Sequence, residues 1–277
     1  MPTQLPDHYA VNRENQGTLA VLKTYLPALE RLGYSVLEDG ERRASELKGR
    51  GNLEEFHLPS GQVLIIRRFR RGGLVRHLSK DRFLDPERPF REIVLSEGLR
   101  ERGFQTPIIA AARSRRLGFM GYRLELITEQ VPGVKSLGRW QAQFRSAGVD
   151  TELQRSMLGV TAQTVRRLHD AGFEHSDLQP ENLLWQPAAA GQDPYLWILD
   201  LDRSKQHADP LLESARAQNL WRLWRYVLRR EATGGTTLSR SDYTRFLVAY
   251  EPDRAERKTL FHSLQHLRAT RSRYHNL

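Results

Sequence analysis

The spacing of apolar residues changes near Pro132 and Gly133, and this change constrains the fold more than any other feature of the chain. Before it, short apolar runs such as residues 63–66 lie between turn residues, as the strands of a hairpin do. After it, apolar residues recur at helical spacing over long stretches, for example residues 153–171. The chain therefore predicts an α+β protein in which a strand-rich half precedes a larger helical half.

The individual elements follow from the same patterns. In the first half we expect a loosely held start over residues 1–16 and a helix over 19–32. Its other elements are predicted to be a helix over 89–102 and strands around 56–58, 63–66, 108–112 and 122–128. The second half is predicted to contain the helix over 153–171, a strand over 195–199, and helices from residue 211 onward that separate near 234–235.

Composition excludes several classes of protein. The chain of 277 residues contains no cysteine, which rules out disulfide scaffolds, zinc fingers, iron–sulfur clusters and thiol catalysis, and fits a reducing cytoplasm. Residues 1–16 lack the pattern of a secretory signal, and no apolar run approaches the roughly 20 residues of a membrane-spanning helix. The formal net charge of +10 favours an anionic partner such as nucleic acid, a phosphorylated lipid, a nucleotide or an acidic membrane surface.

One segment matches the kinase catalytic-loop pattern H-x-D-L-x-x-x-N at every fixed position, from His175 to Asn182. Phosphoryl transfer needs a group that accepts or orients the acceptor proton and oxygen ligands for Mg²⁺. We therefore predict that Asp177 is the catalytic residue, that Asn182 and Asp200 bind metal, and that His175 braces the loop from within. Asp202 is a candidate for an extra ligand or a substrate contact.

The alternative for this segment is that Asp and Asn populate ordinary turns. Four matched positions, the preceding Leu168-His169 and Gly172, and the later strand that ends in Asp200 favour the catalytic interpretation. The interval from Asn182 to Asp200 is longer than a compact loop of this kind needs, which weakens the assignment of Asp200. Residues 187–193 are interpreted as an exposed insertion.

A nucleotide site would also need backbone amides over the phosphates and a cation on a neighbouring strand. Gly49, Arg50 and Gly51 are candidates for the first role, and Arg67 is the candidate for the second. Glu92, on the next predicted helix, is the candidate ion-pair partner of Arg67. A plain hairpin turn at the glycines and an exposed helix carboxylate at Glu92 remain open alternatives.

Two basic segments have two interpretations each. Between residues 67 and 82 lie seven basic residues and one acid, which form either a solvated surface or an anion-recognition loop with Arg70 and Arg71 as substrate contacts. Residues 220–230 combine aromatic and arginine side chains at helical spacing. Such a stripe is either a core helix with a solvated rim or a helix that meets a bilayer surface.

Taken together, these residues resemble the 3-deoxy-D-manno-oct-2-ulosonic acid (Kdo) kinases, which belong to the lipopolysaccharide-core kinases with a protein-kinase-like fold. The resemblance spans about residues 45–230, and its most discriminating element is the Arg-Gly-Gly-Leu sequence at residues 71–74. It also rests on Lys48 to Gly51, Phe90 to Glu92, and the segments 103–107, 175–184 and 199–202. The resemblance implies a bilobal fold, with a strand-rich N-lobe over 1–128, a helical C-lobe over 129–277, and ATP and Mg²⁺ between them.

The resemblance further implies phosphorylation of a Kdo hydroxyl, most simply O-4, in the lipopolysaccharide inner core on a lipid A precursor. The expected location is the cytoplasmic face of the inner membrane, with no obligate protein partner. Two departures from protein kinases, Gln179 for lysine in the catalytic loop and Arg67 for the strand lysine, argue against protein substrates.

Two other functions remain as alternatives. A kinase of a soluble small molecule such as an aminoglycoside would have an acidic acceptor pocket in place of the Arg-Gly-Gly-Leu region. A non-catalytic basic module would bind nucleic acid or a membrane without Mg²⁺-dependent affinity for ATP. The sequence shows no helix-turn-helix or base-stacking motif, so nucleic acid is not an expected partner.

Overall fold

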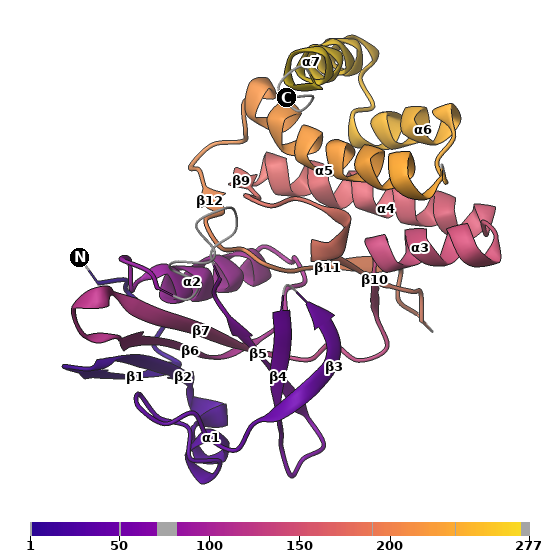
Figure 1. The fold of residues 1–277 in the computed structure, drawn as a ribbon. Helices are drawn as coiled ribbons and strands as arrows, with labels where there is room; N and C mark the ends of the chain where they lie inside the picture. Colours follow the sequence, from indigo (N-terminus) through magenta and orange to yellow (C-terminus); the bar gives the residue numbers. More distant parts are fainter. Residues whose placement is uncertain (1, 50, 71–81, 190, 236, 273–277) are drawn as a thin grey trace. The chain divides into compact units, whose positions relative to one another are not determined.

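The computed structural model describes residues 2–49, 51–70, 82–189, 191–235 and 237–272. Its contacts divide the chain into two compact units, Met1–Pro132 and Gly133–Leu277. Strands dominate the first unit and helices dominate the second (Figure 1). This is the order that the change in apolar spacing predicts.

The N-terminal unit is built on a seven-stranded antiparallel sheet with the strand order β1-β2-β6-β7-β5-β4-β3. Its strands are β1 (Tyr9–Glu14), β2 (Gly17–Leu22), β3 (Arg43–Gly49), β4 (Gly51–His57), β5 (Val63–Arg68), β6 (Ile109–Arg116) and β7 (Tyr122–Glu129). The unit also contains helix α1 (Leu26–Arg31) and helix α2 (Arg88–Glu101).

Side chains alternate across this sheet and form two separate cores. One core contains Phe56, Ile66 and Ile127 together with Leu29 of α1. The other contains Leu124 and Leu126 of β7 together with Phe90 and Ile93 of α2. The period of two along a strand therefore decides which side chains face α2.

Two predictions for the start of the chain are wrong. The first part of the predicted helix over 19–32 is instead β2, the 3-10 helix η1 (Lys23–Tyr25) follows it, and only Leu26–Arg31 is α-helical. The predicted loose start contains β1, where Tyr9 is buried and its hydroxyl donates a 2.8 Å hydrogen bond to the carbonyl of Ile109. A short apolar run fits both helical and strand periodicity, and pairing with β1 and β6 on its two sides makes this run a strand.

In the described part of the C-terminal unit there are five α-helices and two small sheets. The helices are α3 (Leu137–Ala147), α4 (Thr151–Asp170), α5 (Glu213–Gly234), α6 (Arg240–Tyr250) and α7 (Arg254–Ser272). One sheet has the order β11 (Tyr195–Ile198), β10 (Leu183–Gln186), β8 (Lys135–Ser136), and the other pairs β12 (Lys205–Gln206) with β9 (Phe173–Glu174). Among the described residues, no helix combines the length and the apolar character needed to cross a bilayer.

The aromatic and arginine stripe over 220–230 lies on α5. Leu220, Trp221 and Leu223 are buried, and the indole of Trp221 makes an edge contact with that of Trp224. The basic residue Arg229 on the same helix is exposed. Of the two interpretations of this stripe, the structure supports the core helix with a solvated rim.

Candidate active site

The catalytic-loop motif lies between β9 and β10 and includes the short 3-10 helix η4 (Pro180–Asn182). Leu178 is fully buried, and the backbone amide of Asn182 donates a 3.0 Å hydrogen bond to the carbonyl of Gln179. The apolar anchor and the turn hydrogen bond fix the backbone between them. This leaves the polar side chains of the motif to face one another rather than the core.

His175 braces the loop through both ring nitrogens. Its Nε2 donates a 3.0 Å hydrogen bond to the carbonyl of Leu199, and its Nδ1 accepts a 3.2 Å hydrogen bond from the amide of Asp177. This pattern requires a neutral ring with the proton on Nε2. Burial lowers the pKa of His175, although Leu199, Asp200 and Asp177 act in the opposite direction.

The carboxylate of Asp177 is held by two amide side chains of its own loop. Gln179 donates a 2.8 Å hydrogen bond to Oδ2, and the Asn182 amide donates to the main-chain carbonyl of Asp177 at 2.8 Å and to Oδ2 at 3.4 Å. Both bonds use the nitrogen of Asn182, so its carbonyl oxygen is the end that suits a metal. Gln179 therefore contacts the predicted base directly, a role that the sequence analysis did not assign.

The long interval between Asn182 and Asp200 is a hairpin. Strands β10 and β11 pair with Leu183 opposite Ile198, and the amide of Leu199 donates a 2.9 Å hydrogen bond to the carbonyl of Asn182. The hairpin thus returns the chain to Asn182 just before Asp200. Asp200 adopts a left-handed backbone conformation with φ of 58°, which is uncommon for a non-glycine residue and concentrates at functional sites.

The side chains near Asp177 fit a magnesium ion in their donor chemistry. Asn182 offers an amide oxygen and Asp200 a carboxylate, and both are hard oxygen donors. Within the described residues, no group of three or more His, Asp or Glu side chains forms a metal cluster. Mg²⁺ usually keeps several waters and binds through one or two carboxylates plus phosphate oxygens, so a small protein donor set is what it requires.

Asp202 contacts the catalytic loop through its main-chain carbonyl. The hydroxyl of Ser176 donates a hydrogen bond to the main-chain carbonyl of Asp202, and the amide of Ser176 donates a 3.1 Å bond to the hydroxyl of Ser204. These contacts connect the catalytic loop to the segment that follows β11. The proposed role of the Asp202 side chain stays a prediction.

A series of buried, hydrogen-bonded side chains, which the sequence did not reveal, connects the catalytic loop to α5 and α4. The Asn219 amide of α5 donates a 2.6 Å hydrogen bond to the carbonyl of His175, and its oxygen accepts a 3.0 Å bond from Nε2 of His169. Nδ1 of His169 accepts a 2.7 Å bond from the hydroxyl of Tyr250. Burial lowers the pKa of His169 to about 4, against the effect of its bond to Asn219, so this ring is neutral too.

Glu181 is a second residue whose role emerges only from the structure. Its carboxylate accepts hydrogen bonds from the Ser136 hydroxyl, the Arg230 guanidinium and the Tyr226 hydroxyl, the last at 3.2 Å. These partners lie on β8 and α5. The glutamate therefore anchors the catalytic loop to two other elements, and no local sequence pattern predicts these long-range contacts.

In the N-terminal unit, Arg67 of β5 and Glu92 of α2 form an ion pair with a 2.5 Å separation. Glu92 is buried, and the Arg67 guanidinium also lies over the ring of Phe69. The pairing that the sequence predicts is confirmed. The interpretation of Glu92 as an exposed helix carboxylate is wrong.

The adjacent residue, Arg68, faces the other side of the sheet. There it bonds Glu125 of β7 at 3.1 Å and Glu54 of β4 at 2.9 Å. Arg42 and Arg113 also contact Glu125, and Arg113 is almost fully buried. Arg68 is thus part of a buried ionic cluster, whereas Arg67 faces α2.

The glycine candidates lie at a hairpin end. Gly49 closes β3 and Gly51 opens β4, and the two are paired in the sheet, while Arg50 lies outside the described residues. Arg70 follows β5 and is exposed, and Arg71 also lies outside the described residues. The nucleotide and substrate roles of these five residues stay predictions.

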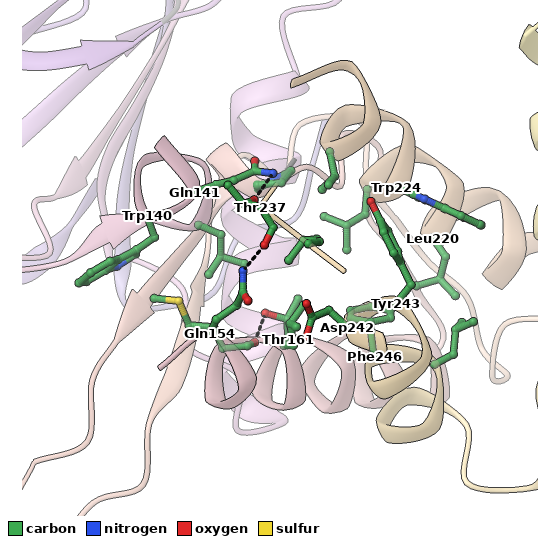
Figure 2. A pocket seen from close by; sticks show the side chains of 18 of the residues that line it. Trp140, Gln141, Gln154, Thr161, Leu220, Trp224, Thr237, Asp242, Tyr243 and Phe246 are labelled. Carbon is green, nitrogen blue, oxygen red and sulfur yellow. Dashed lines mark hydrogen bonds between the residues drawn. The ribbon is translucent and has the colours of Figure 1, made fainter. Parts of the chain in front are cut away.

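The C-terminal unit also contains an apolar cavity of about 170 Å³. Figure 2 shows side chains of α3, α4, α5 and α6 around it, and Pro180 of the catalytic loop also lines it. Among its few polar groups, Gln154 donates a 2.9 Å bond from its amide to the carbonyl of Thr237, whereas Oε1 of Gln141 is buried with no hydrogen-bond partner in the described part of the chain. This composition suits a hydrocarbon group.

Comparison with known proteins places these features in context. The chain matches the lipopolysaccharide kinase (Kdo/WaaP) family over residues 35–250. It is 30% identical over 246 residues to a 3-deoxy-D-manno-octulosonic acid kinase of Xanthomonas axonopodis pv. citri, which covers 86% of this chain and 92% of that protein. It is also 30% identical over 190 residues to the enzyme of the same name from Actinobacillus succinogenes, with 67% and 74% covered.

A solved structure supports the fold. WaaP in complex with acyl carrier protein superposes with a TM-score of 0.57 at 22% sequence identity, over 90% of both chains. This likeness bears on the fold alone, and it agrees with the protein-kinase-like architecture predicted from the catalytic-loop motif.

Proposed function

Because this chain belongs to the lipopolysaccharide kinase (Kdo/WaaP) family, we propose that it transfers the γ-phosphoryl group of ATP to O-4 of Kdo on a lipid A precursor. The family membership makes it a phosphotransferase that acts on a sugar hydroxyl. The identity of the hydroxyl, the lipid carrier and the use of ATP with Mg²⁺ are the proposed part.

The observation that carries the proposal is the arrangement around Asp177. Its carboxylate oxygen Oδ2 is held by Gln179 and Asn182, and its amide is bonded to the neutral ring of His175. A carboxylate fixed in this way can accept the acceptor proton without first reorganising. The sugar hydroxyl then forms its bond to the γ-phosphorus, the bond from that phosphorus to the bridging oxygen of ADP breaks, and the hydroxyl proton passes to Asp177.

Asn182 and Asp200 would hold the metal, which when bound neutralises charge on the phosphates. Arg67 would contact the nucleotide phosphates, and Glu92 would fix its direction. Gly49, Arg50 and Gly51 would bring backbone amides to the same phosphates. Arg70, Arg71 and Asp202 are proposed to contact the acceptor, whose carboxylate and phosphate groups suit guanidinium donors.

The proposed location is the cytoplasmic face of the inner membrane. Its support is the net charge of +10, which suits an anionic surface, and the lipid character of the proposed acceptor. A soluble acceptor of the aminoglycoside type is the main competing substrate class. Mass spectrometry of Kdo-bearing lipid A precursor incubated with ATP, Mg²⁺ and the protein tests the proposal: a single added phosphate supports it. Phosphorylation of an aminoglycoside instead would contradict it.

The apolar cavity favours a second interaction. Since the WaaP structure is a complex with acyl carrier protein, we propose that this chain also binds an acylated carrier protein and takes the acyl chain into the cavity. Acylated carrier protein should raise the melting temperature, whereas unacylated carrier protein should not. Val227→Trp, which fills the cavity, should abolish the increase, and an equal increase with unacylated carrier protein would contradict the proposal.

A further inference from the structure

The turn between β6 and β7 presents an aromatic side chain to solvent. Phe119 lies in the short 3-10 helix η3 (Gly118–Met120) and is 98% exposed, the highest value among the exposed large apolar side chains of the described residues. A single exposed apolar side chain is common on a folded protein, so the meaning of Phe119 depends on what lies near it.

The backbone around Phe119 holds it in this position. The amide of Leu117 donates a 2.7 Å hydrogen bond to the carbonyl of Gly121 and closes the turn. At Gly121, with φ of 100°, an added Cβ would lie 2.6 Å from the carbonyl of Phe83. The glycine therefore allows the turn to approach Phe83, and Phe83 and Tyr122 exchange two backbone hydrogen bonds of 2.9 and 2.8 Å.

This contact places a second exposed apolar residue near the turn. Leu84 follows Phe83 directly and is 82% exposed. The bridge between Phe83 and Tyr122 places the segment that holds Leu84 beside the start of β7, which directly follows the turn. We call Leu84 and Phe119 the apolar tip.

Two exposed arginines, Arg82 and Arg116, lie close to the apolar tip along the chain. From residue 109 to residue 124 the chain contains four arginines and no acidic residue. Arg113 belongs to the buried ionic cluster, but Arg116 is exposed, and so is Arg82, which lies beside Phe83. The acid nearest in sequence to Leu84, Asp85, is paired with Arg91.

We propose that the apolar tip inserts into the interface of an anionic lipid bilayer while Arg82 and Arg116 contact the lipid headgroups. A protein partner would need a standard interface of roughly 800 Å² on this side, whereas two exposed apolar side chains offer little area. Aromatic side chains partition well into the bilayer interface, and each nearby arginine adds attraction to anionic lipid. The inference assigns a specific surface to the proposed membrane location. It rests on the proposed function only in that a lipid-borne acceptor is the reason for the protein to bind a membrane.

The experiment measures binding to vesicles and needs no catalysis. Sedimentation with vesicles of phosphatidylethanolamine and phosphatidylglycerol should show binding that weakens with added salt and is much lower with phosphatidylcholine alone. The double variant Leu84→Ser/Phe119→Ser should bind at least about tenfold more weakly. Leu212→Ser, which removes another exposed leucine from the C-terminal unit, should bind as the unaltered protein does.

Because the chain has no cysteine, Phe119→Cys and Leu212→Cys give single labelling sites for an environment-sensitive dye. The dye at residue 119 should shift to shorter wavelength with anionic vesicles, and the dye at 212 should not. Equal binding of the double serine variant, or loss of self-association in place of loss of vesicle binding, would overturn the proposal.

A kinase assay separates this result from a failure of the proposed function. The double variant should phosphorylate detergent-dispersed acceptor normally and vesicle-embedded acceptor poorly. If the unaltered protein binds vesicles through the tip but phosphorylates neither form, the tip proposal stands and the proposed function fails.

Discussion

Arg67 and Glu92 form an ion pair that joins β5 to α2, with 2.5 Å between the guanidinium and the buried carboxylate. Their neighbour Arg68 faces the opposite side of the same sheet and bonds Glu125 and Glu54. Two adjacent arginines therefore belong to different ionic interactions on opposite faces of the sheet. Only one of them faces α2 and its glutamate.

This difference gives a matched pair of variants. Arg67→Ala should raise the KM for ATP about tenfold and lower kcat, because a charge-assisted contact to phosphate is lost. Arg67→Lys should retain part of the activity, since it keeps the charge but not the planar fork. Arg68→Ala should lower the stability without changing the KM for ATP. An unchanged KM in Arg67→Ala would contradict the nucleotide role.

Gln179 should act through Asp177. Gln179→Leu keeps similar volume but removes the hydrogen bond to Oδ2, and we expect kcat to fall about tenfold with little change in KM. Gln179→Lys restores a donor at the same position and should recover part of the loss. Steady-state kinetics with both substrates check this, and a wild-type kcat in Gln179→Leu would show that the contact does not serve catalysis.

How far the sequence predicts this site depends on the range of the interactions. His175, Asp177 and Asn182 lie in one short motif that is fixed by hydrogen bonds among its own residues. Their local arrangement therefore follows from their spacing in the sequence. Asp200 is reached through the hairpin of β10 and β11, whose register only the pairing of the strands determines.

Asn219 and Glu181 were missed for a physical reason. The partners of Asn219 are His175 and His169, which lie 44 and 50 residues earlier in the chain, and no periodic pattern reports such contacts. The strand over Gly17–Leu22 was missed because its apolar residues are buried on both faces of the sheet, which removes the alternation that identifies an ordinary strand.

Asn219 should be a positioning residue for the catalytic loop. Asn219→Leu removes the donor to the carbonyl of His175 and leaves buried polar groups without this partner, which should cost about 1–3 kcal/mol of stability. We expect kcat to fall more than KM rises. Tyr250→Phe is the control, because it removes the bond to His169 but leaves Asn219 bonded to the carbonyl of His175, and it should affect kcat less. If both variants lose stability equally and kcat falls in neither, the hydrogen-bonded series Tyr250, His169, Asn219 has a structural role alone.

The ionic cluster predicts a specific pH dependence. Burial alone would raise the pKa of Glu125, but hydrogen bonds and charges from Arg42 and Arg113 outweigh it and lower the pKa to about 2. The unfolded chain has the ordinary value, so the carboxylate stabilises the fold above about pH 4.5, and this contribution is lost as the pH falls towards 2.

The contribution is on the order of 3 kcal/mol. Glu125→Gln should be less stable at pH 7, and its free energy of unfolding should depend less on pH between about 5 and 2. Denaturant unfolding at a series of pH values measures both quantities. Parallel pH profiles for the two proteins would contradict this assignment.

The central claim is that Asp177 accepts the proton of a Kdo hydroxyl during phosphoryl transfer. The most direct test compares Asp177→Asn with the unaltered protein for phosphate transfer from ATP to Kdo-bearing lipid, with the melting temperature as the control for folding. We predict a loss of at least about a hundredfold in kcat at an unchanged melting temperature. Undiminished turnover by Asp177→Asn would contradict the account.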